Sequence, residues 1–120
     1  MKECVFCKIA RKEAPATVVA EWDDCLAFVP LNPVVPGHVL VIPKAHRDDF
    51  KQDPFVTASV MYKAAMLARG PCNLITSAGK EATQTVFHFH VHLVPRRDGD
   101  GLMLPWTPDF GEGVNDVRLR

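Results

Sequence analysis

Hydrophobic and polar side chains alternate most regularly over residues 86–95, where the sequence is Val-Phe-His-Phe-His-Val-His-Leu-Val-Pro. Successive side chains of a β-strand point to opposite faces of the sheet. The alternation therefore predicts a strand with one wholly apolar face and a second face that presents His88, His90 and His92. Three of the five histidines of the chain lie in this strand, so its polar face is the expected place of chemistry.

Shorter apolar runs bounded by turn-forming residues predict the remaining elements. A main helix is expected to begin at Asp53, a favourable N-cap, with Pro54 in the first helical position, and to end at Gly70 and Pro71. A short helix is expected over residues 4–12. Four more strands are expected over residues 17–22, 25–29, 38–43 and 72–77.

This order of elements predicts an α+β fold, in which a five-stranded antiparallel meander sheet packs with one main helix and a short N-terminal helix. We expect residues 1–97 to form the domain. Residues 98–120 form a tail rich in Gly, Pro and Asp, whose Trp106 and Phe110 are expected to pack on the domain or on a second subunit.

Composition and charge narrow the class of protein. The chain has 120 residues, of which 48% are apolar, and a formal net charge of zero, so we expect one globular domain. The neutral charge argues against binding to nucleic acid or to an anionic membrane surface. No apolar stretch reaches the ~18 residues of a membrane span, and the first residues lack the apolar region of a signal peptide. These properties predict a cytoplasmic protein without a membrane partner.

The four cysteines are not expected to form disulfides in a reducing cytoplasm. Cys25 and Cys72 lie in apolar runs and are interpreted as core residues. Cys4 and Cys7 form a Cys-x-x-Cys pair, which suits a metal or a redox couple. No strand–CxxC–helix unit surrounds this pair, which weakens the redox interpretation. A tetrahedral zinc site would need two more ligands, for which histidines are available.

The spacing of the three histidines is compatible with three interpretations of their face of the strand: a metal site, a catalytic site, and a polar face without chemistry. On an extended strand the Cα atoms of His88 and His92 lie ~13–14 Å apart, whereas zinc binds nitrogen at about 2.0–2.1 Å, so the three rings cannot easily share one ion. A catalytic row, with a central nucleophile or base between two partners, fits better because titratable groups cluster at functional sites.

Four segments, in order along the chain, resemble the histidine triad (HIT) family of nucleotide-binding hydrolases and transferases. Together they cover most of residues 3–97, and the three alternating histidines preceded by Gln-Thr-Val are highly specific. The segments are Cys4-Val-Phe-Cys-Lys-Ile-Ala10, Cys25-Leu-Ala-Phe28, Pro36-Gly-His-Val-Leu-Val-Ile-Pro-Lys-Ala-His46 and Gln84-Thr-Val-Phe-His-Phe-His-Val-His-Leu-Val-Pro-Arg96.

The resemblance implies a nucleotide phosphoramidase or a dinucleoside polyphosphate hydrolase. In this chemistry His90 attacks the α-phosphorus to form a nucleotidyl-histidine intermediate, which water then hydrolyses. A hydrogen bond from Nδ1–H of His90 to a backbone carbonyl would leave Nε2 free to attack. The resemblance also implies that His92 binds a phosphate oxygen, that His38 orients this pair, and that Gln84 and Thr85 donate hydrogen bonds to the phosphate or the leaving group.

The same resemblance indicates where the nucleotide, expected to carry a purine, is bound. Pro30 stands where many members have an acidic residue or Asn for the ribose hydroxyls, and proline offers no side-chain hydrogen bond. Ribose recognition is therefore expected to differ, with a 2′-deoxy or altered substrate as an alternative. The residues assigned to the nucleotide are Phe6, Ile9, Leu26, Phe28, Asn32 and Ser77, with core packing as the alternative for the four apolar ones.

Bacterial members often hold a structural zinc ion, and the resemblance assigns its ligands. Cys4 and Cys7 would bind Zn²⁺ together with His46 and His88, which is a closed Cys₂His₂ set of the structural kind. His88 would then face the metal while His90 faces the phosphorus. Members also commonly form two-fold dimers, so a homodimer is expected.

Two other functions are open. The first is a zinc-stabilised module that binds or senses nucleotides with little catalysis, which the change at Pro30 suggests. The second is an enzyme that processes nucleic-acid ends. The neutral charge and the lack of an appended binding domain argue against the second and favour a small-molecule nucleotide as the partner.

Overall fold

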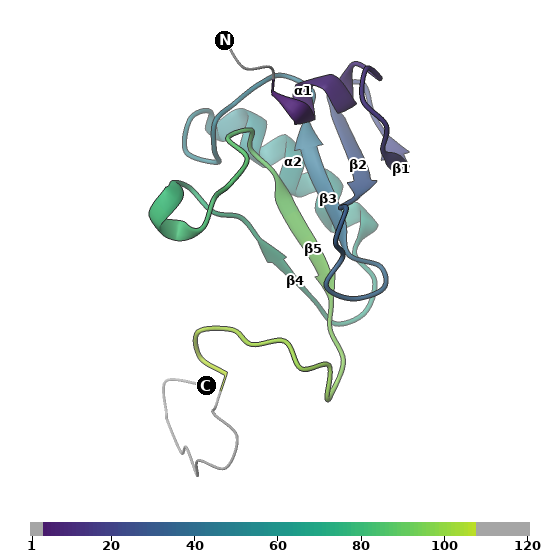
Figure 1. Cartoon of the computed structure of the whole chain (residues 1–120), viewed down its shortest axis with the longest axis vertical. Coiled ribbons are helices and arrows are strands. Elements are labelled where there is room, and N and C mark those ends of the chain that lie inside the picture. The colour runs from purple at the N-terminus through teal and green to yellow at the C-terminus, as the bar shows by residue number, and fades with distance from the viewer. Residues whose placement is uncertain (1–3, 108–120) are drawn as a thin grey trace.

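The computed structural model of the protein describes residues 4–107, which form one five-stranded antiparallel sheet with two α-helices (Figure 1). The predicted fold class, including the main helix and the short N-terminal helix, is confirmed. The elements are α1 (Val5–Ala10), β1 (Thr17–Glu21), β2 (Cys25–Val29), β3 (Val39–Pro43), α2 (Pro54–Leu67), β4 (Cys72–Ile75), a 3₁₀ turn (Lys80–Ala82) and β5 (Val91–Pro95).

The strand order across the sheet is β1-β2-β3-β5-β4, so a simple meander holds only for the first three strands. All neighbouring strands are antiparallel, and β3 and β4 therefore run in the same direction. Parallel strands need a long crossover connection, which α2 provides here. The position between β3 and β4 is filled by the last strand, β5. This topology places the end of the histidine sequence in the interior of the sheet.

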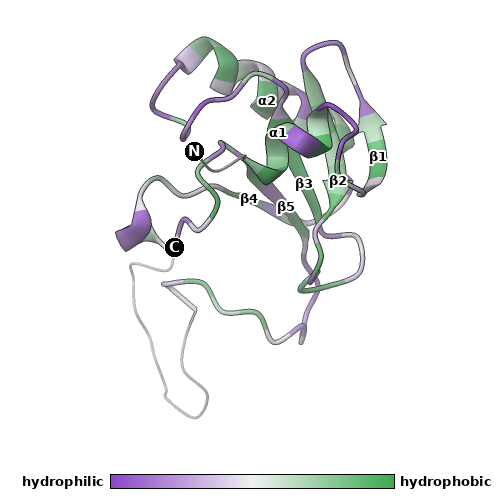
Figure 2. Ribbon diagram, turned by 45° about the horizontal axis from the view of Figure 1, so that its top comes forward, coloured by the Kyte–Doolittle hydropathy of each residue, from purple (hydrophilic) through white to green (hydrophobic). Residues whose placement is uncertain are grey.

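The two faces of the sheet are covered by different helices, because alternate residues of each strand point to opposite sides. Figure 2 shows hydrophobic residues gathered along α2 and the strands that it covers. The cluster on that face contains Cys25, Ala27, Val41, Val60, Ala64, Phe89 and Val91. The cluster on the opposite face, where α1 packs, contains Phe6, Ile9, Leu26, Phe28, Leu40 and Ile42. The predicted core position of Cys25 is confirmed, since its exposed fraction is 1%.

The predicted strand over residues 86–95 is wrong in its first half, because β5 begins only at Val91. Its neighbours end at the same level: Val41 pairs with Val91 on one side and Ile75 pairs with His92 on the other. The predicted apolar face also fails at Phe87, which is 48% exposed. Alternation alone does not make a strand where no neighbouring strand continues. We call residues 86–90, which precede β5, the histidine segment.

The other boundaries differ by smaller amounts. The short helix is confined to Val5–Ala10, since Cys4 acts as its N-cap. The main helix ends at Leu67, earlier than predicted. The strands predicted over 17–22, 38–43 and 72–77 each lose one or two terminal residues. Cys72, expected in the core, is only half-buried because β4 lies at the edge of the sheet.

The chain after β5 is anchored by Arg96, whose guanidinium hydrogen-bonds to Asp100 at 2.8 Å and to Asn73 at 2.7 Å. Trp106, one of the two expected anchors of the tail, is 60% exposed. Phe110, the second expected anchor, lies outside the described residues. Neither of the helices in the described part of the chain has the length and apolar character needed to cross a membrane.

The cap of α2 yields a test of the fold. One carboxylate oxygen of Asp53 accepts from the N–H groups of Phe55 at 3.1 Å and Val56 at 3.3 Å, and the other pairs with Arg47 at 3.2 Å. Asp53→Ala removes these contacts and should lower the free energy of unfolding by about 1 kcal/mol. Urea denaturation measures this change. Asp23→Ala, in the exposed turn before β2, is the control and should leave the midpoint unchanged; equal midpoints for the two variants would contradict the capping role.

Candidate active site and metal centre

His90 lies at the end of the histidine segment with its Nδ1 atom 2.7 Å from the main-chain oxygen of His88. A carbonyl oxygen only accepts, so Nδ1 carries the hydrogen and Nε2 carries a lone pair. This is the hydrogen bond expected from the sequence. The ring of Phe6 packs edge-on against the His90 ring, with centroids 5.2 Å apart. Burial lowers the pKa of His90, although the bond to His88 opposes the change, and the ring is therefore neutral at pH 7.

The backbone of His90 is fixed by a residue that the sequence did not single out. Thr76 lies just beyond the end of β4, and its hydroxyl donates to the carbonyl oxygen of His90 at 2.7 Å. This side-chain bond continues the contact between the two segments past Ile75 and His92, the last backbone pair of the ladder. The position of Thr76 immediately after an expected strand could have indicated this role. The sequence pattern instead favoured its neighbour Ser77, as a nucleotide-binding residue.

A chain of hydrogen bonds sets the tautomers of His38 and His92. The N–H of Val34 donates to Nδ1 of His38 at 3.1 Å, so the hydrogen of the His38 ring is on Nε2. That atom lies 3.0 Å from Nδ1 of His92 and donates to it. The hydrogen of His92 is consequently on its own Nε2. His38 is buried, with an exposed fraction of 4%.

The two histidines thus present opposite groups from one face of the sheet. His90 offers a lone pair and His92 offers an N–H donor, and their ring centroids are 5.2 Å apart. Burial lowers the pKa of His92 to about 4, helped by the neighbouring His90 and His38, and burial also lowers the pKa of His38. All three rings are neutral at pH 7 as a result. Such a pair can attack an electrophilic centre while holding an oxygen bound to that centre.

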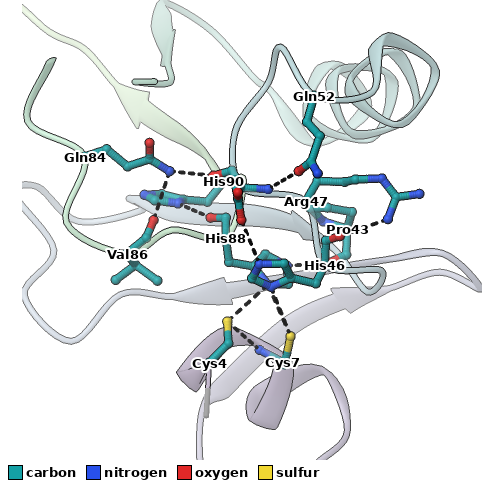
Figure 3. A network of polar contacts seen from close by, with 11 residues as sticks. Cys4, Cys7, Pro43, His46, Arg47, Gln52, Gln84, Val86, His88 and His90 are labelled. Carbon is teal, nitrogen blue, oxygen red and sulfur yellow. Dashed lines mark hydrogen bonds and ion pairs between the residues drawn. The ribbon is translucent and has the colours of Figure 1, made fainter. Parts of the chain in front are cut away.

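A second group of side chains lies on the other side of His88 (Figure 3). One ligand atom from each of four residues falls within 4.8 Å of the others: Cys4, Cys7, His46 and His88. Nδ1 of His88 is 3.3 Å from Sγ of Cys4 and 3.6 Å from Sγ of Cys7, and Nδ1 of His46 is 3.4 Å from Sγ of Cys7. Ligand atoms of a tetrahedral ion with bonds of about 2.0–2.3 Å lie roughly 3.3–3.8 Å apart. The four side chains therefore fit a metal ion.

The far nitrogen of each ring supports this arrangement. Nε2 of His88 lies 2.8 Å from the carbonyl oxygen of Pro43, and Nε2 of His46 lies 3.0 Å from a carboxylate oxygen of Asp48. Both acceptors place the ring hydrogen on Nε2 and leave the lone pair of Nδ1 pointed at the thiols. Hydrogen bonding of the second ring nitrogen to a carboxylate or carbonyl is typical of histidines that bind metals. Asp48 and the carbonyl of Pro43 were not predicted.

Gln84 differs from its expected role. Its side chain is 4% exposed, and its amide nitrogen donates to the carbonyl oxygens of Asp48 at 2.6 Å and Val86 at 3.1 Å. Its oxygen accepts from the N–H of Gly79 at 2.8 Å. Both amide hydrogens are committed to the protein, so the structure does not show the donor to a phosphate that the resemblance implied.

The remaining predicted residues fall into two groups. The four apolar ones belong to the cluster beneath α1, and the ring of Phe6 also packs against the rings of His88 and His90. Leu26 and Phe28 are buried within the sheet, which agrees with the alternative of core packing. Among residues 4–107, the three polar ones make no hydrogen bond to the histidines; these are Asn32, Ser77 and Thr85.

Comparison with known proteins connects this geometry to a family. Residues 11–99 match the family described as the HIT domain. An uncharacterised HIT-like protein of Methanocaldococcus jannaschii is 39% identical, over 97% of this chain and 92% of its own length. The adenosine 5′-monophosphoramidase HNT1 of Saccharomyces cerevisiae is 37% identical, over 86% of this chain and 69% of its own length.

Solved structures give the same result. A zinc-bound histidine triad family protein from Mycobacterium smegmatis superposes with a TM-score of 0.73 at 40% identity, covering 88% of this chain and 84% of that chain. The TM-score and the level of identity indicate that the two molecules share one fold.

The burial of His92 predicts how the site responds to pH. A pKa of about 4 in the folded chain lies below the value near 6.5 of an unfolded histidine. The unfolded state therefore takes up a proton first as the pH falls, and stability should decline from about pH 6.5 down to pH 4. Titration of the His92 ring followed by NMR should show a midpoint near 4. A midpoint at or above 6.5 would show that the ring is not held neutral.

Proposed function

The chain belongs to the HIT domain family, and we propose on this basis that it hydrolyses nucleoside phosphoramidates or dinucleoside polyphosphates at the α-phosphate. The observation that supports this most directly is the pair of opposite tautomers, with a lone pair on His90 beside an N–H donor on His92. A yeast relative carries the name adenosine 5′-monophosphoramidase, which agrees with the first of these substrate classes.

In the proposed first step, Nε2 of His90 attacks the α-phosphorus. A bond forms between Nε2 and phosphorus, while the bond from phosphorus to the leaving group breaks and the leaving group takes its electron pair and a proton from solvent. The His90 ring becomes positively charged, and the hydrogen bond from its Nδ1 to the His88 carbonyl strengthens as that charge develops. The N–H of His92 holds a phosphoryl oxygen throughout.

In the second step, water attacks the same phosphorus and the bond to Nε2 breaks. The electron pair returns to Nε2, a proton of the water passes to solvent, and the nucleoside monophosphate leaves. The division of one difficult displacement into two easier ones is the gain of covalent catalysis. The neutral ring is restored for the next cycle by the same contact with His88.

The nucleotide is proposed to lie across the α1 side of the histidines. Phe6 contacts the catalytic ring directly and is the best supported wall for a purine base, with Ile9 beside it. Asn32, Ser77 and Thr85 are proposed to reach the sugar and phosphate when a substrate is bound. Pro30 supplies no hydrogen-bonding side chain, so a sugar without the usual diol contacts is compatible with this rim.

The metal is proposed to be a structural Zn²⁺ held by Cys4, Cys7, His46 and His88. The closed set of two thiolates and two imidazoles favours zinc and leaves no open position for a reacting water. A zinc-bound relative of 40% identity supports the choice of ion. A pair of zinc-binding thiolates is kept reduced in a reducing compartment, so we further propose a cytoplasmic location.

We also propose a homodimer. Within residues 4–107, β4 lies at an edge of the sheet and pairs on one side only, and α2 carries large exposed side chains, including Tyr62 at 65% and Met66 at 52%. Exposed edges and apolar patches of this kind are typical of interfaces. Residues 98–120 are proposed to pack on the domain or on the second subunit.

The function is tested by His90→Ala, which should lower kcat at least about a thousandfold because no other group supplies the nucleophile. Wild-type protein should form a nucleotidyl adduct on His90, detected by mass spectrometry after rapid quenching. Asp23→Ala is the control and should keep full activity. Absence of both adduct and hydrolysis over a panel of nucleoside phosphoramidates and dinucleoside polyphosphates would refute the enzyme. Calorimetric nucleotide binding that survives in His90→Ala, with negligible wild-type turnover, would instead favour the binding module.

The metal is tested by elemental analysis, which should find one zinc per chain. Cys4→Ser should remove the metal and lower the free energy of unfolding by about 2 kcal/mol or more, since metal binding is coupled to folding. Cys72→Ser is the matched control, because this thiol lies on β4 outside the four ligands, and it should retain zinc. A metal-free wild-type preparation of unchanged thermal stability would count against a structural ion.

A further inference from the structure

The histidine segment is held in place by contacts other than a β-ladder. It lies against residues 43–48, which comprise the last residue of β3 and the loop after it, and which we call the metal-ligand loop because they include His46. The N–H of Phe89 donates to the carbonyl of Arg47 at 2.6 Å, and the ring of His88 binds the carbonyl of Pro43 at 2.8 Å. These bonds connect the two segments at the level of His88, whereas Val86, at the beginning of the histidine segment, packs against the apolar cluster beneath α1.

Gln84 supplies the connection at that beginning. Its amide nitrogen binds both the metal-ligand loop, at the carbonyl of Asp48, and the first residue of the histidine segment, at the carbonyl of Val86. Its oxygen binds the N–H of Gly79 at the start of the 3₁₀ turn. Two obligatory acceptors and one obligatory donor fix the orientation of the amide. One buried side chain therefore joins three stretches of backbone. Figure 3 shows the contact of its amide nitrogen with Val86.

Asp48 makes this connection relevant to both sites. Its carbonyl accepts from Gln84, while its carboxylate holds the ring of His46, a proposed metal ligand. Val86, the other acceptor, leads within two residues to His88, whose side chain faces the thiols and whose carbonyl fixes the tautomer of His90. Displacement of the amide would therefore move a metal ligand from each segment and the carbonyl on which His90 depends.

We propose that Gln84 is a positioning residue that sets the metal-ligand loop and the histidine segment in register, so that one buried amide aligns the metal ligands and the nucleophile together. This inference rests on the proposed function for its catalytic consequence. Gln84 does not touch the substrate in this role, in contrast to the phosphate contact that the sequence resemblance implied.

The test compares Gln→Glu substitutions at two positions, Gln84 and Gln52, whose side chains both bind the backbone of Asp48. In Gln84→Glu the carboxylate cannot donate, so it faces the carbonyls of Asp48 and Val86 without a hydrogen. Gln52 instead uses its oxygen to accept from the N–H of Asp48, so Gln52→Glu keeps that bond. The two variants add the same charge on either side of Asp48, but only one of them removes donors.

For Gln84→Glu we expect zinc to be lost to a chromogenic chelator at least about tenfold faster than from wild type, and kcat to fall at least about tenfold with KM changed by less than about threefold. Gln52→Glu should match wild type in all three quantities. If Gln84→Glu does not fold, Gln84→Asn replaces it, because its amide is one methylene too short to reach all three partners and should change the same quantities in the same direction.

Wild-type values of zinc loss and kcat in the Gln84 variant would overturn the proposal. A rise in KM alone, with kcat and zinc retention unchanged, would overturn it in favour of a direct substrate contact. The metal measurement separates this proposal from the proposed function: if wild type shows no hydrolysis, the enzyme is refuted while zinc retention still decides the role of Gln84. If wild type binds no zinc, the role of Gln84 is decided by whether its substitution lowers kcat or raises KM.

Discussion

The hydrogen bond between Nδ1 of His90 and the carbonyl of His88 determines what the site can do. An imidazole without such a partner exchanges its hydrogen between two nitrogens and presents either a donor or a lone pair. Here the carbonyl of His88 selects the tautomer of His90 with its hydrogen on Nδ1, so Nε2 of His90 is an acceptor. The opposite form of His92 follows from Val34 and His38 by the same rule. Backbone groups thus set both tautomers, and no carboxylate is needed to orient either ring.

The availability of the His88 carbonyl follows from the point at which the sheet ends. In the interior of an antiparallel sheet, carbonyl groups are used by neighbouring strands. The ladders on both sides of β5 stop at Val91 and His92, so the carbonyl of His88 lies outside the ladders and can accept a hydrogen bond from a side chain. His88 therefore makes contacts with both its backbone and its side chain. Its carbonyl accepts from His90, while its ring faces the thiols and the carbonyl of Pro43.

The sequence predicted the sheet, the cap of α2 at Asp53 and the buried position of Cys25, because each depends on local alternation or local hydrogen bonding. The predicted strand was wrong over residues 86–90, because the alternation of polar and apolar residues does not indicate where the neighbouring strands end. The role of Thr76 and the burial of Gln84 were missed for a related reason. Both depend on which backbone groups remain unpaired after the whole chain has folded.

The proposed metal centre and the proposed catalytic row are consequently parts of one arrangement. A strand would hold the histidines by its ladder, but it would also occupy the carbonyl that orients the His90 ring. The irregular segment keeps that carbonyl available and needs other support, which the thiols, the metal-ligand loop and Gln84 provide from three directions. Buried polar contacts of this kind are favourable only when every member is satisfied, and among residues 4–107 no buried side-chain nitrogen or oxygen lacks a partner. The cost of leaving the sheet is offset by specific contacts, and the benefit is a His90 ring with a single defined tautomer.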